Sequence, residues 1–284
     1  MATWIFLRGL TRESRHWGEF VDQFQQALPY QTVVTLDLAG NGRLNHQRSA
    51  SRVEDMVADC RLQLALRHIA PPYHLLAMSL GAMVAVAWAQ LQPQEVAAQV
   101  LINTSLRPFS PFYQRLRPAN YGPLLRLLLF GAAPQNSERA ILHMTSRGGH
   151  ETVLSSWLAL RHTHPVARLN ALRQLLAAVR YAAPADPPRM PTLLFGSAQD
   201  QLVSVQCTLA LARQWACNYH IHPDAGHDLA LDAGPWLAQQ VREWLSGLTQ
   251  NRPSVVVPPC RTSVLPASER LAGTILRQSC FKSG

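Results

Sequence analysis

Short apolar segments alternate with longer segments of helical periodicity along most of the chain. The apolar segments are typical of buried β-strands, because they are short and rich in Val, Ile, Leu and Phe. Between them, apolar side chains recur every three or four positions, as on one face of a helix. We expect strands at residues 3–7, 31–36, 73–78, 97–102, 190–195 and 218–221, and helices at 14–28, 51–68, 80–90 and 235–248. This alternation predicts an α/β fold with a doubly wound, mostly parallel sheet covered by helices.

Two of the predicted helices begin with capping signals. Ser14 precedes the first helical stretch and is a suitable N-cap. Ser51 and Glu54 have the spacing of a capping box, in which each side chain binds a free backbone amide of the first turn. We therefore expect the second helix to begin at Ser51.

A different pattern occupies residues 105–185. This segment holds no convincing strand, only Leu-rich and Arg-rich helical stretches interrupted by Pro and Gly. We expect a helical lid inserted into an α/β core made of residues 1–104 and 186–248. After the core the pattern is lost, so residues 249–284 are predicted to form a flexible C-terminal tail that activity does not need.

The composition is that of a folded globular protein, with 48% hydrophobic and 15% charged residues. The net charge of +9 is concentrated in residues 105–185, at +8, and in residues 250–284, at +4. The rest of the chain is mildly acidic and has no zinc-finger or basic-zipper pattern, so nucleic acid is not an expected partner. No apolar run is long enough to span a membrane, and the opening residues do not resemble a signal peptide, so we expect a cytoplasmic protein.

The strongest chemical signal is a serine between a predicted strand and a predicted helix. Ser79 is flanked, two positions away on each side, by the small residues Ala77 and Gly81. Small residues are needed there because a nucleophile elbow is a very tight turn. Such a turn exposes the hydroxyl above the sheet, and the N-terminus of the next helix faces developing negative charge. Ser79 is therefore the candidate nucleophile.

A serine nucleophile needs a base that is itself oriented by an acid. Asp200 lies in the loop after the fifth predicted strand, and His227 lies in the loop after the sixth. The carboxyl ends of parallel strands share one edge of a sheet, so these side chains are expected to meet Ser79 there. We predict a Ser-His-Asp triad. The neighbouring Asp228 is expected to play a supporting part, because it lies too close along the same turn to reach the His227 ring.

Over residues 3–248, this order of motifs resembles the α/β-hydrolase superfamily. Besides the elbow and the two strand-end loops, the family's loop after the first strand is matched by Arg8, Gly9 and Leu10, with Arg8 in place of the usual histidine. The resemblance implies that the backbone amides of Leu10 and Leu80 form the oxyanion hole.

The implied reaction is hydrolysis of a carboxylic ester through an acyl-enzyme. His227 takes the proton from Ser79, while Asp200 orients the imidazole and stabilises its cation. Neither a metal nor another cofactor is expected, since the cysteines and histidines show no complete set of metal-ligand spacings. Trp17 follows the oxyanion loop and is a candidate substrate contact, although its position on a predicted helix also fits the core.

The apolar and arginine-rich lid suits an acyl chain held on an acidic carrier protein. Small lidded esterases that cleave the methyl ester of pimeloyl-acyl-carrier protein in biotin synthesis look similar, with a Ser-Leu-Gly elbow and a basic helical lid. The leading hypothesis is a carboxylesterase of that kind, acting on a small-molecule ester or an acyl-carrier-protein-linked ester. A generalist short-chain esterase, a cofactor-free lyase or thioesterase of the menaquinone-pathway type, and a slow-turnover ligand receptor remain as alternatives.

Overall fold

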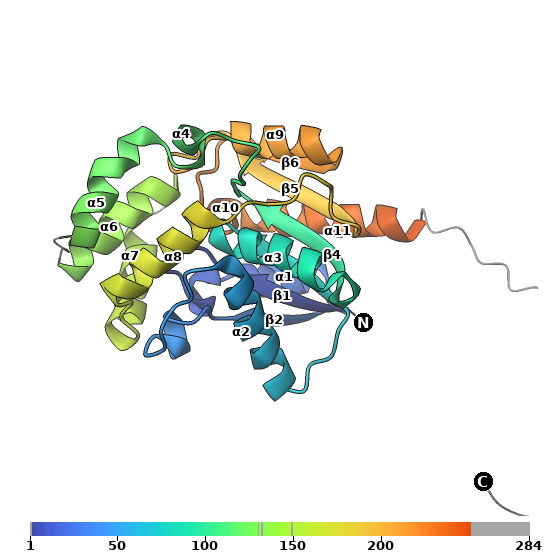
Figure 1. Cartoon of the computed structure of the whole chain (residues 1–284), viewed down its shortest axis with the longest axis horizontal. Helices are drawn as coiled ribbons and strands as arrows, with labels where there is room; N and C mark the ends of the chain where they lie inside the picture. Colours follow the sequence, from blue (N-terminus) through green and yellow to red (C-terminus); the bar gives the residue numbers. More distant parts are fainter. Residues whose placement is uncertain (1, 130, 132, 149, 251–284) are drawn as a thin grey trace, which may run out of the picture.

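The computed structural model describes residues 2–129, 131, 133–148 and 150–250 (Figure 1). Within them, one parallel sheet has the strand order β2-β1-β3-β4-β5-β6. The strands are β1 (Thr3–Leu7), β2 (Thr32–Leu36), β3 (Tyr73–Met78), β4 (Val96–Ile102), β5 (Thr192–Ser197) and β6 (Asn218–His222). The predicted α/β fold with a doubly wound sheet is confirmed, and each strand end lies within two residues of its predicted position.

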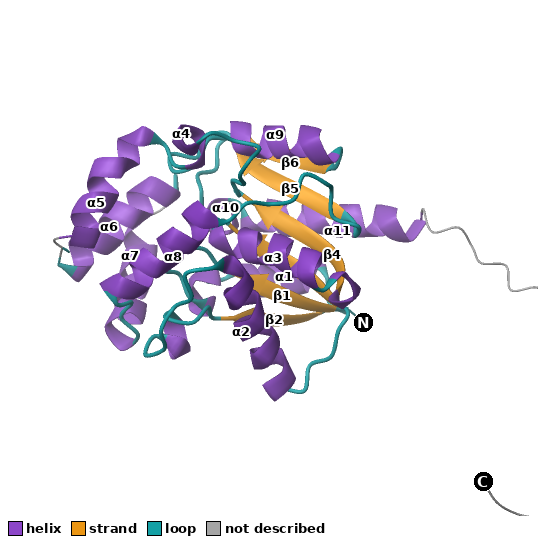
Figure 2. Ribbon diagram, viewed as in Figure 1, coloured by secondary structure: helices purple, strands orange, loops and turns teal. Residues whose placement is uncertain are grey.

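The sheet sorts its side chains onto two apolar cores, because successive residues of a strand point to opposite faces. In β1, Ile5 and Leu7 pack into one core, while Trp4 and Phe6 pack into the other. The first core receives side chains from α2 (Val53–Leu66), α3 (Leu80–Leu91), α8 (Arg168–Arg180) and α9 (Gln206–Trp215). The second receives them from α1 (Phe20–Ala27), α10 (Leu229–Asp232) and α11 (Gly234–Gln250). Both faces of the sheet are therefore covered by helices (Figure 2).

The predicted starts of the first and second helices are wrong, because the backbone at each start adopts another conformation than the one expected. The stretch expected as one helix from Ser14 divides into a short 3-10 helix, η1 (Ser14–Trp17), and α1, with Gly18 at a φ of +53° between them. The N-cap of η1 is Glu13, and the Ser14 amide donates to the Asp37 carboxylate at 2.6 Å. The second helix has Arg52 as its N-cap, in an extended conformation and without a capping hydrogen bond, so the expected Ser51 capping box does not form.

The connection from β4 to β5 is built from helices that lie together beside the sheet (Figure 1). They are α4 (Phe112–Arg115), α5 (Tyr121–Leu129), α6 (Pro134–Thr145), α7 (His150–Thr163) and α8 (Arg168–Arg180). A single parallel bridge between Arg107 and Ala182 joins the two ends of this helical segment. Its entry and exit are therefore fixed to each other at the sheet.

The C-terminal part of the described chain ends in a helix. A short helix, α10 (Leu229–Asp232), leads into α11, which continues to Gln250, two residues beyond the predicted boundary. The remainder of the predicted tail, residues 251–284, lies outside the described residues. In the part of the chain that the structure describes, none of the helices combines the length and the apolar character needed to cross a membrane.

Candidate active site

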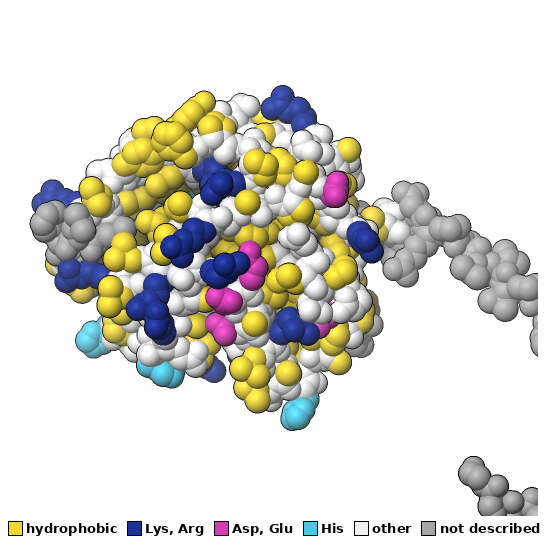
Figure 3. Space-filling model, viewed as in Figure 1, with side chains coloured by type: hydrophobic (Ala, Val, Ile, Leu, Met, Phe, Trp, Pro, Cys, Tyr) yellow, Lys and Arg dark blue, Asp and Glu magenta, His cyan; other side chains and the backbone are white. Residues whose placement is uncertain are grey.

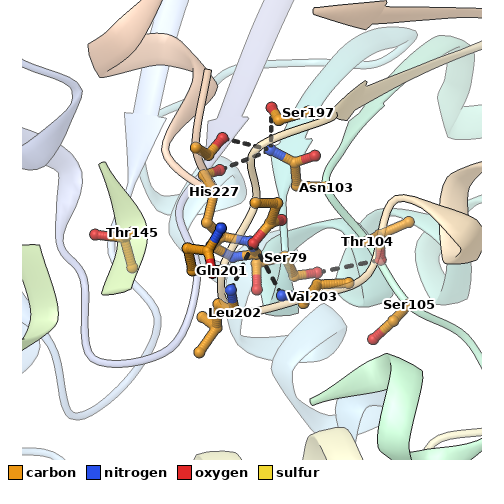
Figure 4. A network of polar contacts seen from close by, with 12 residues as sticks. Ser79, Asn103, Thr104, Ser105, Thr145, Ser197, Gln201, Leu202, Val203 and His227 are labelled. Atoms are coloured by element: carbon orange, nitrogen blue, oxygen red, sulfur yellow. Dashed lines mark hydrogen bonds and ion pairs between the residues drawn. The ribbon is translucent and has the colours of Figure 1, made fainter. Parts of the chain in front are cut away.

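Ser79 connects β3 to α3 in a strained turn. Its backbone has φ +56° and ψ −117°, a region that residues with a side chain rarely occupy. The Ser79 amide donates to the carbonyl of Ile102 at 3.0 Å, and the Thr104 hydroxyl donates to the Ser79 carbonyl at 3.4 Å (Figure 4). Contacts with the end of β4 therefore hold the candidate nucleophile in the conformation that an elbow requires.

Two glycines let the loop after β1 pack directly on this turn. A Cβ at Gly81 would lie 2.5 Å from the Leu7 carbonyl oxygen and 2.6 Å from that of Arg8. A Cβ at Gly9 would lie 3.1 Å from the Ser79 Cβ. Only the absence of side chains permits this approach. The small residue expected at position 81 thus has a direct steric reason.

Asp200 and His227 form a buried hydrogen-bonded pair. The Nδ1 atom of His227 lies 2.7 Å from Oδ2 of Asp200, and the two side chains are 4% and 1% exposed. The other carboxylate oxygen, Oδ1, accepts the amides of Leu202 at 2.8 Å and Val203 at 2.9 Å. These donors hold the carboxylate in a fixed orientation. With Nδ1 engaged, Nε2 of His227 is the nitrogen that remains for Ser79.

Asn103 is a site residue that the sequence reasoning missed. It follows β4 directly, at a φ of +45°. Its side-chain amide donates to the Ser197 hydroxyl at 2.9 Å and to the His227 carbonyl at 2.8 Å (Figure 4). Asn103 therefore ties the histidine loop to the end of β5. The rule that identified Asp200, a polar residue just after a strand, could have found it.

Arg8 makes a buried ion pair next to the same loop. The Arg8 side chain is 2% exposed, and both of its terminal nitrogens donate to the Asp228 carboxylate, Nη1 to Oδ1 at 3.0 Å. Nη1 also lies 3.6 Å from the sulfur of Met78, the residue before Ser79. Asp228 is thus paired with Arg8 and leaves the His227 ring to Asp200, as expected. One guanidinium contacts both the elbow and the histidine loop.

A cavity of about 780 Å³ is bounded by these residues and by the helical segment. On one side, Ser79, His227, Gly9 and Leu10 line it. On the other side, α5 to α8 and the connections between them contribute mainly apolar side chains: Leu124, Leu127, Ile141, Leu160, Val166 and Leu175. The candidate nucleophile and base therefore open into one mostly apolar space, which is typical of a small-molecule site.

The amides expected to form the oxyanion hole make no hydrogen bond to other groups within the described residues. Leu80 is the first residue of α3, where a helix leaves its amide without an intrahelical acceptor. Leu10 lies in the loop that packs on Ser79 and lines the cavity. Both donors thus remain available to a negatively charged oxygen.

Trp17 does not line the cavity, which corrects the predicted substrate contact. Its side chain is 2% exposed, and its ring packs against Phe6 and Phe20 in the core beneath α1 and α11. The guanidinium of Arg8 lies over the ring, 4.8 Å from its centre. The apolar ring is buried with other aromatic side chains, and Arg8 stands between the core and the site.

A charged cluster on the cavity wall was not expected from the sequence. Glu138 of α6 is 4% exposed, and its two oxygens accept from Arg12 at 2.8 Å and from Arg161 of α7 at 2.9 Å. Burial alone would raise the pKa of Glu138, but the charges and hydrogen bonds of the two arginines outweigh it and lower the pKa. The sequence does contain a signal, since Glu138 is one of two acidic residues among ten arginines in the segment 105–185.

His16 belongs to the same cluster and is neutral. Its Nε2 atom lies 2.9 Å from Nη1 of Arg12, and its ring packs edge-on against Trp157. Burial is the main cause that lowers the pKa of His16 well below its ordinary value, and the charges of Arg12 and Arg8 act in the same direction. The Arg12 guanidinium also lies over the Trp157 ring, 4.3 Å from its centre. The loop after β1 therefore contacts helix α7 through the packing of Arg12 and His16 against the Trp157 ring.

Other histidines make contacts of their own. His164 approaches Arg15, with Nδ1 2.6 Å from Nη2, and Nδ1 of His222 accepts the Ala225 amide at 3.0 Å. Across the described ranges, no three His, Cys, Asp or Glu side chains are grouped so that they could hold a metal ion.

The sequence profile of the Alpha/beta hydrolase family matches residues 4–240. The chain belongs to this family. Solved structures share its fold: a thermophilic esterase from Thermogutta terrifontis has 20% identity and a TM-score of 0.68, covering 87% of this chain and 90% of that one. An enol-lactonase from Burkholderia xenovorans has 16% identity and a TM-score of 0.71, covering 86% and 91%. The putative non-heme bromoperoxidase BpoC from Mycobacterium tuberculosis has 22% identity and a TM-score of 0.69, covering 87% and 93%.

No curated protein matches the sequence of this α/β hydrolase. At such low identities, the solved structures establish the common fold and not a common substrate. The reaction has to be argued from the site itself.

Proposed function

We propose that this α/β hydrolase cleaves carboxylic esters through an acyl-enzyme on Ser79. The observation that carries the proposal is the buried His227–Asp200 pair, which opens into the same cavity as the strained Ser79 turn. A serine hydroxyl is a weak nucleophile at neutral pH, and an oriented imidazole is the usual means of activating it. The neighbours named as an esterase and an enol-lactonase support acyl chemistry on this fold.

The proposed mechanism uses the same groups in both half-reactions. Nε2 of His227 takes the hydroxyl proton as Oγ of Ser79 attacks the ester carbonyl, and the amides of Leu10 and Leu80 bind the oxyanion. His227 then gives the proton to the departing alcohol. Water, deprotonated by the same imidazole, attacks the acyl-enzyme, and His227 returns that proton to Oγ of Ser79 as the carboxylic acid is released. Throughout, Asp200 orients the imidazole and stabilises its cation.

We further propose that α4 to α8 form a lid over the site and that their outer surface docks an acidic carrier protein bearing the ester. Apolar side chains are exposed there next to arginines, as Figure 3 shows for the face with α4, α5 and α8. Exposed apolar residues include Phe112, Leu125, Leu169, Leu172 and Val179, and exposed arginines include Arg107, Arg126 and Arg180. An apolar surface edged by one sign of charge suits an oppositely charged partner.

The hydrolase proposal is tested with nitrophenyl and methyl esters, using Ser79→Ala as the blank. We expect hydrolysis that depends on Ser79 and a burst of alcohol release equal to the enzyme concentration when deacylation is slow. A folded wild-type protein that shows no Ser79-dependent hydrolysis of any ester would refute the proposal and favour the lyase or receptor alternatives.

The carrier proposal needs a separate comparison. We expect kcat/KM for a methyl ester to be higher on acyl-carrier protein than free, and this advantage to shrink as salt screens the arginines. Replacing Arg126 and Arg180 by Gln should reduce the advantage, while Arg242→Gln on α11, also exposed but on another surface, should not. Equal rates for the free and carrier-bound esters would overturn this part of the proposal and leave a generalist esterase.

A further inference from the structure

The cavity contains a corner in which positive charge and hydrogen-bond donors outnumber their protein partners. The arginine corner consists of Arg12, His16, Glu138 and Arg161, all on the cavity wall. Its single carboxylate gives one oxygen to each guanidinium, Oε2 to Arg12 and Oε1 to Arg161. Two positive charges thus share one negative charge.

The neighbouring charges on the wall do not make up the difference. Asp228 is taken by Arg8, and Glu13 is taken by Arg15. A low-polarity cavity with excess positive charge favours an anionic occupant.

The donors of the corner lead to the same conclusion independently of the charge. Within the described residues, Nη2 of Arg12 is buried and has no hydrogen-bond acceptor. The amide of Glu13 and Nη1 of Arg12 both approach the His16 ring, at 3.2 Å and 2.9 Å. A neutral imidazole has one acceptor nitrogen, so it satisfies one of these donors and not both. The corner therefore lacks acceptor atoms, and buried donors without acceptors are costly.

The corner lines the same cavity as Ser79, into which the acyl chain of a bound ester would extend. Arg12 follows Gly9 in the loop after β1, and its amide donates to the Gly9 carbonyl at 3.2 Å. Gly9 itself packs on Ser79. The neighbouring parts of the wall, at Ile141 and Leu160, are apolar. The cavity thus offers a reacting group at one place, an apolar wall, and a polar corner that lacks acceptors.

We propose that the arginine corner binds a carboxylate on the acyl chain of the substrate, so that the enzyme prefers monoesters of dicarboxylic acids. The planar guanidinium of Arg12 matches a carboxylate, which would supply the missing acceptor oxygens and balance the excess charge. This inference rests on the proposed ester hydrolysis and concerns free esters, because an acyl chain whose far end is bound to a carrier has no carboxylate there.

The test compares two esters of equal chain length, monomethyl adipate and methyl hexanoate, which differ in the terminal carboxylate. We expect kcat/KM to be at least about tenfold higher for the adipate monoester, mainly through a lower KM, since a charge-assisted hydrogen bond contributes that much. Arg12→Met should reduce the ratio of the two kcat/KM values by about tenfold or more. The matched control is Arg139→Met, which removes an exposed arginine from the same helix as Glu138 and should leave the ratio unchanged.

A second substitution predicts a change in the opposite direction. Glu138→Gln removes the one carboxylate that competes for the two guanidinium groups, so it should increase the ratio in favour of the adipate monoester. Arg12→Lys keeps the charge without the planar fork and should give an intermediate ratio. These variants separate an anion site from a purely structural ion pair, for which Glu138→Gln would not raise the ratio.

Binding without turnover distinguishes failure of this inference from failure of the hydrolase proposal. Adipate should bind Ser79→Ala in a calorimeter, and binding should weaken about tenfold or more when Arg12→Met is added. A wild-type ratio near one, or a ratio that persists in folded Arg12→Met and Arg161→Met variants, would refute the anion site while leaving ester hydrolysis in place. Absence of Ser79-dependent turnover together with adipate binding that requires Arg12 would refute the hydrolase proposal and support the site.

Discussion

The two sides of the cavity are built in different ways. On the sheet side, Ser79 is held at a positive φ, a Cβ at Gly81 would clash with the neighbouring backbone, and the Asp200–His227 pair is nearly inaccessible. On the helical side, the wall consists mainly of apolar side chains such as Leu124 and Ile141. On the outer surface of the same segment, Leu125 and Leu169 are 56% and 63% exposed. On the sheet side, backbone contacts fix the positions of the candidate catalytic groups. On the helical side, the cavity wall is formed mainly by side chains.

This difference separates the reaction from the choice of substrate. The proposed acyl transfer needs a nucleophile, a base and two amides at fixed positions, and small displacements of such groups reduce rates strongly. A pocket wall needs a suitable shape and polarity, which can change one side chain at a time. Substitutions on the sheet side should therefore have the larger effects.

The largest effect is expected for Asp200→Asn. With its oxygen held by the Leu202 and Val203 amides, the Asn side chain turns its NH2 group toward Nδ1. The neutral amide also lacks the charge that stabilises the imidazolium, so kcat should fall about 10³-fold to 10⁴-fold. Circular dichroism should show an unchanged fold. Asp224→Asn, an exposed aspartate on the same loop as His227, is the control and should stay within about twofold of the wild-type kcat. Retention of more than about a tenth of kcat in Asp200→Asn would show that another group orients the imidazole.

A smaller effect is expected for Gly81→Ala. The added Cβ would meet the Leu7 and Arg8 carbonyl oxygens, so the turn and the loop after β1 must separate. We expect a loss of about 1–3 kcal/mol in the free energy of unfolding, measured by denaturant titration, together with a lower kcat.

Two substitutions away from this contact serve as comparisons. Gly247→Ala in α11 has no atom within 4 Å of the new Cβ and should be neutral or stabilise the protein by up to about 1 kcal/mol. Leu169→Ala on the helical side should change stability by no more than about 0.5 kcal/mol. If Gly81→Ala were as harmless as these two, the close packing of the loop on the elbow would not be needed.

The smallest effect concerns pH and the contact between the two sides. The pKa of His16 is lowered in the folded protein, chiefly by burial, so the unfolded chain binds its proton more readily. The contribution of neutral His16 to the free energy of unfolding is therefore fully present above the ordinary pKa of 6.5. As the pH falls below that value, the free energy of unfolding decreases by at most about 1.4 kcal/mol per pH unit. The groups that face the ring are Arg12, Arg8, Arg15 and Glu13.

His16→Gln isolates this contribution, because its side chain does not titrate. Free energies of unfolding measured at about pH 7.5 and about pH 5.5 should differ less in the variant than in the wild type. The remaining histidines contribute equally to both proteins. An identical pH dependence in the two would contradict the assignment of a neutral, buried His16.

Much of the fold could be predicted because it depends on local pattern. Each strand of the sheet is a short apolar run, and its burial on both faces follows from the helices on either side. The elbow was recognisable because Ala77, Ser79 and Gly81 lie next to one another in the chain. Asp200 and His227 were recognisable because each lies in the loop that follows a strand, and their hydrogen bond is a consequence of the sheet order.

The errors and omissions concern residues whose partners are distant in the chain. The sequence position of Trp17 was compatible with either a pocket wall or the core. In the structure its ring packs against Phe6 in the core. Arg12 and Glu138 lie 126 positions apart, and neither has a local sequence signal for its partner. The Ser51 capping box failed because the residue after it is extended, which sequence spacing does not reveal.

By itself, therefore, the sequence determined the α/β class, the strand order along the chain and the candidate Ser79, Asp200 and His227, because each follows from contacts between near neighbours or from the common edge of a parallel sheet. The tertiary structure decided which side chains surround that chemistry. The Arg8–Asp228 pair forms where the loop after β1 meets the histidine loop, and the arginine corner forms where the loop after β1 meets the helical segment. Long-range packing creates such contacts, and a one-dimensional pattern does not encode the distance between its members.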